Sequence, residues 1–165
     1  MSKAREYAAK EHASVNQKYD GQPYMIHIDL AAKVGEKYID LIPAAEQQDV
    51  MAGIYVHDVL EDTHASYNDL KRSLGFIVAE YSYALQNEKG RVRGDRANDK
   101  YYQGIKAYKH AVFVKLCDRY ANTAYSKQSG SSMFKKYKSE FKEFQSKLWD
   151  GRYQELWNEL EQLYD

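Results

Sequence analysis

The sequence predicts an all-α protein, a bundle of about eight or nine helices. Only two of its 165 residues are proline, Pro23 and Pro43, and each lies between two stretches of helical periodicity. Apolar residues recur at steps of three and four through most of the chain, as they do on the buried face of an α-helix. We expect helices at residues 2–14, 26–39, 44–61, 66–74, 76–87, 98–108, 111–126, 131–148 and 151–163.

Local signals support several of these boundaries. Ser66 is a suitable N-cap for the fourth helix, and Gly75 separates the fourth helix from the fifth. The last two helices carry amphipathic stripes, formed by Phe134, Tyr137, Phe141, Phe144 and Leu148 and by Tyr153, Leu156, Leu160 and Leu163. We expect these stripes to pack against the body of the protein or against a second copy, which would form a homodimer through the C-terminal helices.

The length and composition favour a single globular domain that neither coats nucleic acid nor binds a membrane. A chain of 165 residues can bury a real core, so we expect a single domain over 1–165, with a core at 1–126 and a helical extension at 131–165. The 24 basic and 24 acidic residues give no net charge, which argues against a protein that coats nucleic acid or a membrane surface. No apolar stretch approaches the roughly 18 residues that a membrane span needs.

The cysteine content and the N-terminus indicate the compartment. Cys117 is the only cysteine, so no disulfide forms within the chain, as is usual in a reducing compartment. Residues 1–10 are charged and lack the apolar core of a signal peptide. We therefore expect a cytoplasmic protein.

The most informative stretch is residues 57–63, His-Asp-Val-Leu-Glu-Asp-Thr, which follows the apolar run 50–56. Ionisable groups at the end of a buried helix are costly unless they are paired or bound to a metal. On one continuous helix, His57, Asp58, Glu61 and Asp62 would fall within an arc of about 140° and face one cavity. Imidazole with carboxylates suits Zn, Fe or Mn. The alternative is a helix C-terminus with solvated acids, where acids are unfavourable.

Three other places in the chain carry related motifs. Residues 21–27 read Gly-Gln-Pro-Tyr-Met-Ile-His, and residues 115–122 read Lys-Leu-Cys-Asp-Arg-Tyr-Ala-Asn. Between them, Leu-Gly at 74–75 is followed by Val-Ala at 78–79. In order and spacing, the four motifs resemble those of the HD-domain metal-dependent phosphohydrolases. The version with Glu-Asp is similar to the hydrolase domain of the RelA/SpoT enzymes and to the small alarmone hydrolases, over residues 7 to about 125.

The resemblance implies a fold, a metal and a reaction. The fold would be an HD-domain helical bundle with a metal site between helices. The metal ligands would be His27, His57, Asp58 and Asp118, and the metal Mn²⁺. The reaction would release pyrophosphate from the 3′ position of guanosine tetra- or pentaphosphate, written (p)ppGpp. Glu61 and Asp62, one turn beyond the ligands, would serve general acid/base chemistry on the attacking water or the leaving group.

The substrate contacts are less regular. The family's Arg-Lys pair falls on Lys18 and Tyr19, and an aromatic ring at Tyr19 can stack on a base. Asn122 and Lys115 share a helix face with Asp118, so both can touch a ligand held there, although Lys115 can also be a buried structural cation. A usual Arg of the family is Ala124 here. We therefore expect Lys18, Tyr19, Asn122 and Lys115 to contact the substrate.

These departures leave other functions open. One is a phosphohydrolase of the same chemistry acting on another nucleotide, such as an adenosine alarmone or the phosphate of NADPH. Another is a binding protein with a vestigial site. The segment 86–99, with two glycines and several cations, is either a loop near the pocket whose cations meet phosphate or a solvated surface loop.

Overall fold

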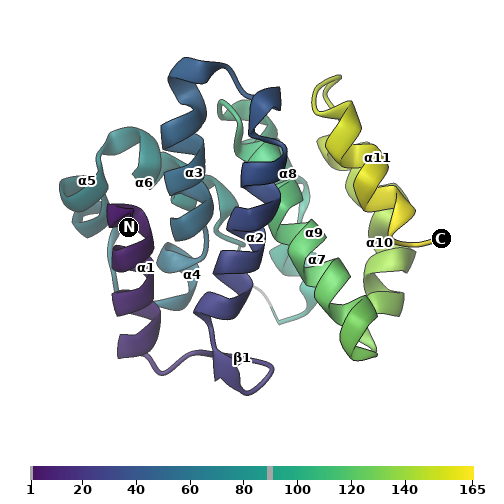
Figure 1. Ribbon diagram of the computed structural model, residues 1–165, viewed down its shortest axis with the longest axis horizontal. Coiled ribbons are helices and arrows are strands. Elements are labelled where there is room, and N and C mark those ends of the chain that lie inside the picture. Colours follow the sequence, from purple (N-terminus) through teal and green to yellow (C-terminus); the bar gives the residue numbers. More distant parts are fainter. Residues whose placement is uncertain (1, 89–90) are drawn as a thin grey trace.

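The computed structural model describes residues 2–88 and 91–165, and its regular elements are almost entirely helices (Figure 1). The longer helices are α1 Lys3–Ser14, α2 Met25–Lys37, α3 Gln47–Val56, α5 Tyr67–Leu74, α6 Phe76–Leu85, α8 Asp99–Ala107, α9 Ala111–Ser129, α10 Met133–Leu148 and α11 Gln154–Gln162. Two single turns of helix, α4 Val59–Asp62 and α7 Arg93–Arg96, join them, with 3-10 turns at Ile39–Leu41 and Ala44–Glu46. The only strands within the described ranges are β1 Lys18–Tyr19 and β2 Gln22–Pro23.

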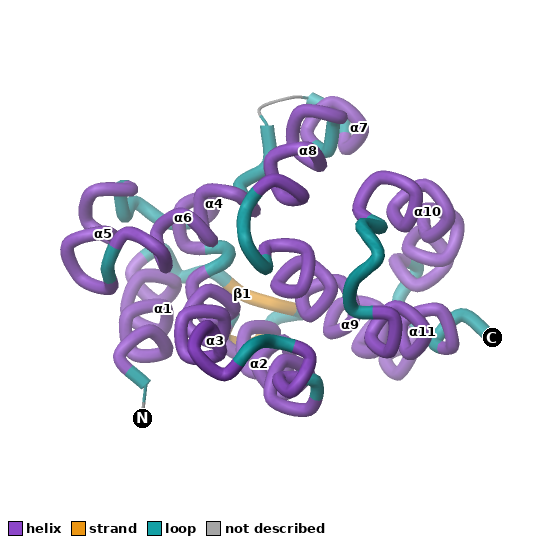
Figure 2. The backbone as a smooth tube through the Cα atoms, turned by 90° about the horizontal axis from the view of Figure 1, so that it is seen from above, coloured by secondary structure: helices purple, strands orange, loops and turns teal. Residues whose placement is uncertain are grey.

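Helix α9 is central to the bundle. It packs against α2, α3, α6, α8, α10 and α11, while α1 and α5 cover the far side of α3 and α6 (Figure 2). Of the residues of α9, Val112, Phe113, Val114 and Leu116 are fully buried. Its length and burial make it a rigid support for Asp118, which projects from its middle turns.

The predicted helix over 44–61 is wrong, because the chain breaks at His57 and Asp58. The Ser82 hydroxyl donates to the Val56 carbonyl at 2.7 Å, and the ring of His57 bonds the Ile54 carbonyl at 2.6 Å. These side chains form hydrogen bonds with backbone carbonyl groups in the last turn of α3, where the helix ends. Because of the break, Glu61 and Asp62 lie in the first turn of α4 and not at the C-terminal end of α3.

A hairpin between α1 and α2 was not expected from the sequence. Asp20 and Gly21 form its two-residue loop with φ of 52° and 75°, the positive values that a type I′ turn requires. Lys18 pairs with Pro23 and Tyr19 with Gln22. The Asp-Gly dipeptide is itself a strong hairpin signal. The hairpin brings Tyr19 back over the start of α2.

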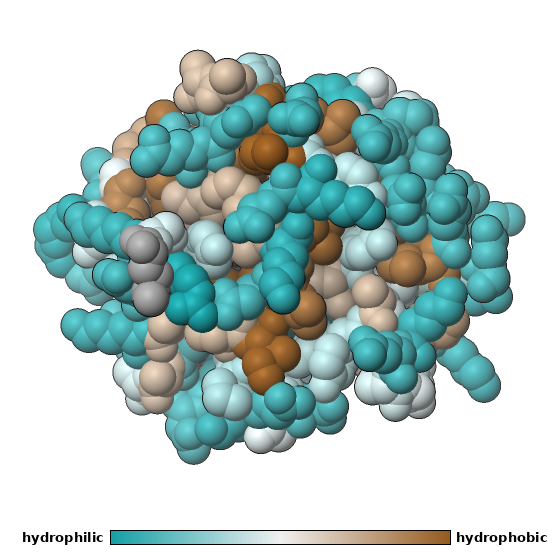
Figure 3. Space-filling model, viewed as in Figure 1, coloured by the Kyte–Doolittle hydropathy of each residue, from teal (hydrophilic) through white to brown (hydrophobic). Residues whose placement is uncertain are grey.

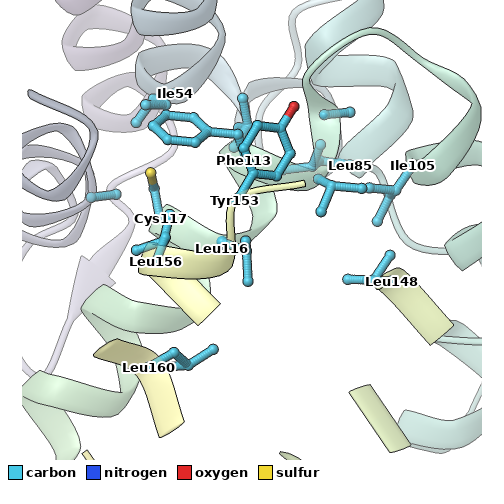
Figure 4. Close-up of a cluster of buried hydrophobic side chains, with 14 of the residues drawn as sticks. Ile54, Leu85, Ile105, Phe113, Leu116, Cys117, Leu148, Tyr153, Leu156 and Leu160 are labelled. Carbon is cyan, nitrogen blue, oxygen red and sulfur yellow. The ribbon is translucent and has the colours of Figure 1, made fainter. Parts of the chain in front are cut away.

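Helices α10 and α11 bury their predicted stripes against the body of the protein. Tyr137, Phe141, Phe144, Leu148 and Leu156 are all buried. Figure 4 shows Leu156 beside Leu116 and Cys117 of α9, and Leu148 on the side of Ile105 of α8. The stripes are therefore used within one chain. A homodimer through these helices remains a prediction, and it would have to use their polar faces and Trp149, which is 37% exposed.

The surface seen in Figure 3 is mostly polar. On the face seen in Figure 3, hydrophobic side chains occur in small patches among hydrophilic ones. Across residues 2–88 and 91–165, no helix combines the length and the apolarity that a membrane crossing needs.

Candidate active site

A polar cavity of about 210 Å³ contains most of the residues that the sequence singled out. Its walls come from the residue before α2, the break after α3, α4, the end of α6 and the residues after it, α8 and α9. The lining consists of Tyr24, His57, Asp58, Glu61, Asp62, Leu85, Asn87, Tyr101, Lys115, Asp118 and Asn122. A larger cavity of about 750 Å³, near the N-termini of α1 and α3, contains none of the expected site residues.

Four side chains converge at the inner end of the polar cavity. His27 from α2, His57 and Asp58 from the break, and Asp118 from α9 each offer a ligand atom, and these atoms lie within 4.8 Å of one another. Asp118 Oδ1 is 2.9 Å from His27 Nε2 and 3.2 Å from His57 Nε2. Asp58 Oδ2 is 3.1 Å from His57 Nε2 and 3.9 Å from His27 Nε2. The cluster could hold a divalent metal.

The hydrogen bonds of His57 show that a cation fits this cluster. A carbonyl oxygen only accepts, so Nδ1 of His57 must carry the proton that bonds Ile54. In the neutral ring, Nε2 then presents a lone pair to two carboxylate oxygens, and such an arrangement needs a proton or a metal ion between the groups. Burial lowers the pKa of His57, but the charges of Asp58 and Asp118 together outweigh it and raise the pKa well above its usual value.

Lys115 and Asn122 hold the carboxylate of Asp118 in place. Lys115 Nζ is 2.9 Å from Asp118 Oδ2, and the Asn122 amide donates to Asp118 Oδ1 at 3.2 Å. Burial opposes the charged form of Asp118, yet Lys115 and the two imidazoles keep the pKa of that carboxyl well below its usual range. Lys115 is thus a partly buried partner of Asp118 and also lines the cavity, while its contact with a substrate stays a prediction.

Glu61 and Asp62 stand beside the cluster without belonging to it. Glu61 keeps access to solvent at the rim, and crowding by protein atoms with the charges of Asp58 and Asp62 raises its pKa to about 7. Burial and the charge of Asp58 also raise the pKa of Asp62, whose Oδ2 accepts a hydrogen bond from Gln17 at 3.0 Å. A carboxyl group that titrates near neutrality can both accept and donate a proton.

The hairpin places only one of its two expected contacts at the site. The hydroxyl of Tyr19 donates to Asn122 Oδ1 at 2.8 Å, and its ring stacks on His27 with centroids 5.0 Å apart. Lys18 is exposed, and among the described residues no hydrogen bond or ion pair joins it to the cluster. Tyr19 also borders a neighbouring cavity of about 210 Å³, which shares Asn122 with the polar cavity.

Comparison with known proteins supports the resemblance seen in the sequence. No family model matches the chain. Over 81 residues, 48% of the chain, it is 32% identical to guanosine-3′,5′-bis(diphosphate) 3′-pyrophosphohydrolase of Aquifex aeolicus (strain VF5). That match spans about a tenth of the relative's length, 10%. A solved structure, described as a metazoan ortholog of SpoT that hydrolyzes ppGpp and plays a role in starvation responses, superposes with a TM-score of 0.76. The chain has the SpoT-type fold.

This likeness covers 99% of the chain and 94% of the solved structure, at 20% sequence identity. The all-α fold class and the resemblance to HD-domain alarmone hydrolases are thereby confirmed. Because the identity is low, the structural likeness itself concerns the fold.

Within the SpoT-type fold, sequence reasoning missed three residues that support the cluster. The hydroxyl of Tyr24 donates to Asp58 Oδ2 at 2.5 Å. Gln17 bridges Asp62 to His12, whose Nδ1 lies 2.7 Å from the Gln17 amide oxygen, and the ring of His12 packs on Tyr24 with centroids 4.7 Å apart. Tyr24 belongs to the Gly-x-Pro-Tyr motif, so its position was marked. Gln17 and His12 carry no motif.

Of the described residues in the segment 86–99, only Asn87 reaches the cavity wall. Asn87 lines the cavity, while Arg93 turns away to form an ion pair with Glu140 of α10. The alternatives of a phosphate-binding loop and a solvated surface loop also concerned Lys89 and Gly90, which lie outside the described residues.

Proposed function

We propose that this protein is a metal-dependent hydrolase that removes the 3′-pyrophosphate of guanosine tetra- or pentaphosphate. The observation that carries the proposal is the convergence of two imidazoles and two carboxylates in the polar cavity of a SpoT-type fold. The names of both similar proteins refer to ppGpp or to its 3′-pyrophosphohydrolysis. The complete cluster favours an active enzyme over a vestigial binding site.

We further propose that the metal is Mn²⁺, held by His27, His57, Asp58 and Asp118. A mixed set of nitrogen and oxygen donors suits a transition metal of intermediate hardness. A divalent metal bound there would supply Lewis-acid chemistry, lowering the pKa of a water and offsetting phosphate charge.

The side chains around the cluster would carry the remaining steps. Glu61 is suited to take a proton from the attacking water, because its pKa of about 7 makes it a base near neutral pH. Asp62, held by Gln17, is suited to orient that water or to protonate the leaving oxygen. Lys115 places a buried positive charge on the cavity wall, where it can contact a phosphate oxygen. Lys18, exposed on β1, would reach the substrate only at its outer end.

A second candidate is the same chemistry on another nucleotide. It is favoured by Tyr19, which stands where the family has a cation and occupies the space between Asn122 and His27. The test is product analysis of the Mn²⁺-loaded protein with ppGpp, with an adenosine 3′-diphosphate analogue and with NADPH. Our proposal predicts pyrophosphate and GDP from ppGpp at the highest kcat/KM. Orthophosphate from NADPH, with ppGpp intact, would overturn it.

Replacement of Tyr19 by alanine should weaken substrate binding without removing the metal. A stacked base contributes about 1–3 kcal/mol, so we expect KM to rise by about 5- to 150-fold while Mn²⁺ content stays unchanged. Tyr19→Phe is the matched control, since it keeps the ring and removes only the hydrogen bond to Asn122. An unchanged KM in Tyr19→Ala would exclude this side chain from substrate recognition.

Metal affinity should depend on pH. His57 has a raised pKa in the metal-free protein, so a proton competes with the metal for its Nε2. Lowering the pH adds that proton, and we expect Mn²⁺ affinity to fall by up to about tenfold per pH unit for each proton displaced. Isothermal titration calorimetry from about pH 6 to 8, in buffers of different ionisation enthalpy, measures both affinity and proton release. A pH-independent affinity would show that no imidazole ligates the metal.

A further inference from the structure

Arg119 is a buried cation whose hydrogen-bonding capacity is incompletely used. It follows Asp118 on α9, and its side chain is 7% exposed. The guanidinium lies over the ring of Phe144 at 4.2 Å and near that of Tyr137 at 5.0 Å. Its Nη1 is buried and has no hydrogen-bond partner among the described residues. A buried donor in this state destabilises the protein unless something accepts its hydrogen bond.

The nearest carboxylate, that of Glu140, does not accept a hydrogen bond from Nη1 of Arg119. Glu140 Oε1 is 3.7 Å from Nη1, too far for a good hydrogen bond. Both oxygens of Glu140 instead accept from Arg93 of α7, at 2.8 and 3.0 Å. Glu140 is therefore neutralised by Arg93, and the charge of Arg119 is only partly compensated.

Arg119 borders a cavity of about 290 Å³ between α7, α8, α9 and α10. Arg93 and Lys136 also line it, opposed by Glu140 and Glu143, so its walls carry one net positive charge. No lining residue is shared with the polar cavity that holds the His/Asp cluster. The volume lies at the small end of the range for ligand pockets, about 300–1,000 Å³.

We propose that this cavity is a second anion site, which binds a compact oxyanion of the phosphate or pyrophosphate class through Arg119, Arg93 and Lys136. The planar guanidinium forms paired hydrogen bonds with tetrahedral oxyanions, and Arg119 has a buried donor ready for one.

A backbone hydrogen bond of α7 links the site to a residue beside the catalytic cavity. Arg93 of α7 contacts α10 through its ion pair with Glu140. The backbone N–H of Glu88 donates to the Arg96 carbonyl at 3.0 Å, and the adjacent Asn87 lines the catalytic cavity. An anion at Arg93 and Arg119 would therefore stabilise α7 and, through the hydrogen bond of Arg96 to Glu88, the chain next to Asn87 on the cavity wall.

The test is calorimetric titration of orthophosphate and of pyrophosphate into the full chain, with and without Mn²⁺. The metal-free arm does not depend on hydrolysis, so it separates this site from the proposed function. We expect binding in both arms, weakened at least tenfold in Arg119→Gln and about three- to tenfold in Lys136→Gln. Lys136 is exposed, so its replacement leaves the fold intact even if Arg119→Gln destabilises it. Lys138→Gln, exposed on the same helix and outside the cavity, is the matched control and should bind normally.

The Nε–H resonances of the arginines report the location directly. Those of Arg119 and Arg93 should shift on titration of the metal-free chain with either anion. The two anions compete for one site, and the tighter one identifies which of them the cavity prefers. Absence of binding in the metal-free chain, or binding unaffected by both Arg119→Gln and Lys136→Gln, would overturn the proposal.

Discussion

Asp58→Ala is expected to abolish turnover and to weaken Mn²⁺ affinity by more than about 100-fold. Outer residues of metal sites typically change affinity by about 10- to 100-fold, and a direct ligand should exceed that range. Asp58 faces His57 at 3.1 Å, so its removal takes one carboxylate from the cluster and leaves the other three groups in place. Calorimetry of Mn²⁺ binding and a steady-state assay of ppGpp hydrolysis measure the two losses.

Two controls distinguish a lost ligand from a lost fold. Asp58→Asn keeps the size of the side chain and can still accept a hydrogen bond from Tyr24, yet it removes the charge. Circular dichroism and thermal unfolding should show both variants folded, since Asp58 lies outside the hydrophobic core. A folded Asp58→Ala protein with full activity would contradict the assignment of the cluster as the catalytic centre.

Glu61→Gln and Asp62→Asn should each retain the metal and lose most of the rate. General acid/base groups typically contribute about 10²- to 10⁴-fold, so we expect kcat to fall within that range while Mn²⁺ affinity changes by less than about threefold. If Glu61 is the base, its carboxyl group must be ionised to act. Because its pKa is raised to about 7, the rate should increase as the pH rises towards neutrality. That limb of the pH–rate profile should be absent in Glu61→Gln.

Comparing the loss of activity with the loss of bound metal in each variant decides whether the acid carries a proton or binds the metal. Glu6→Gln, an exposed carboxyl on α1, serves as the control for a change of one charge and should behave as the native protein. If Asp62→Asn loses metal in proportion to activity, Asp62 is a ligand and not a proton carrier. Unchanged rates in both variants would require another source for the proton transfer.

Much of the fold could be predicted because the sequence marks it locally. Ser66 forms the N-cap of α5 with a capping box, and Gly75 separates α5 from α6, as the sequence indicated. The break at His57 could not be predicted, since the apolar pattern continues through Val59 and Leu60. It depends on Ser82, a residue 26 positions beyond the carbonyl it bonds, and therefore on tertiary packing.

Part of the candidate site could also be predicted, although its residues are far apart in the sequence and no local signal joins them. His27 and Asp118 are 91 positions apart, and no local pattern joins them. The sequence linked them through the resemblance of two motifs, and the packing of α2 against α9 brings their side chains within 2.9 Å. Gln17 and His12 support the site through hydrogen bonds that no motif records.

The central claim is that His27, His57, Asp58 and Asp118 hold the metal on which hydrolysis depends. Anomalous diffraction at the manganese edge, from crystals of the active Mn²⁺-loaded protein, tests it most directly. We expect one strong peak at bonding distance, about 2–2.5 Å, from the two Nε2 atoms and from both carboxylates. A protein that hydrolyses ppGpp with its manganese peak elsewhere, or with none at this cluster, would contradict the account.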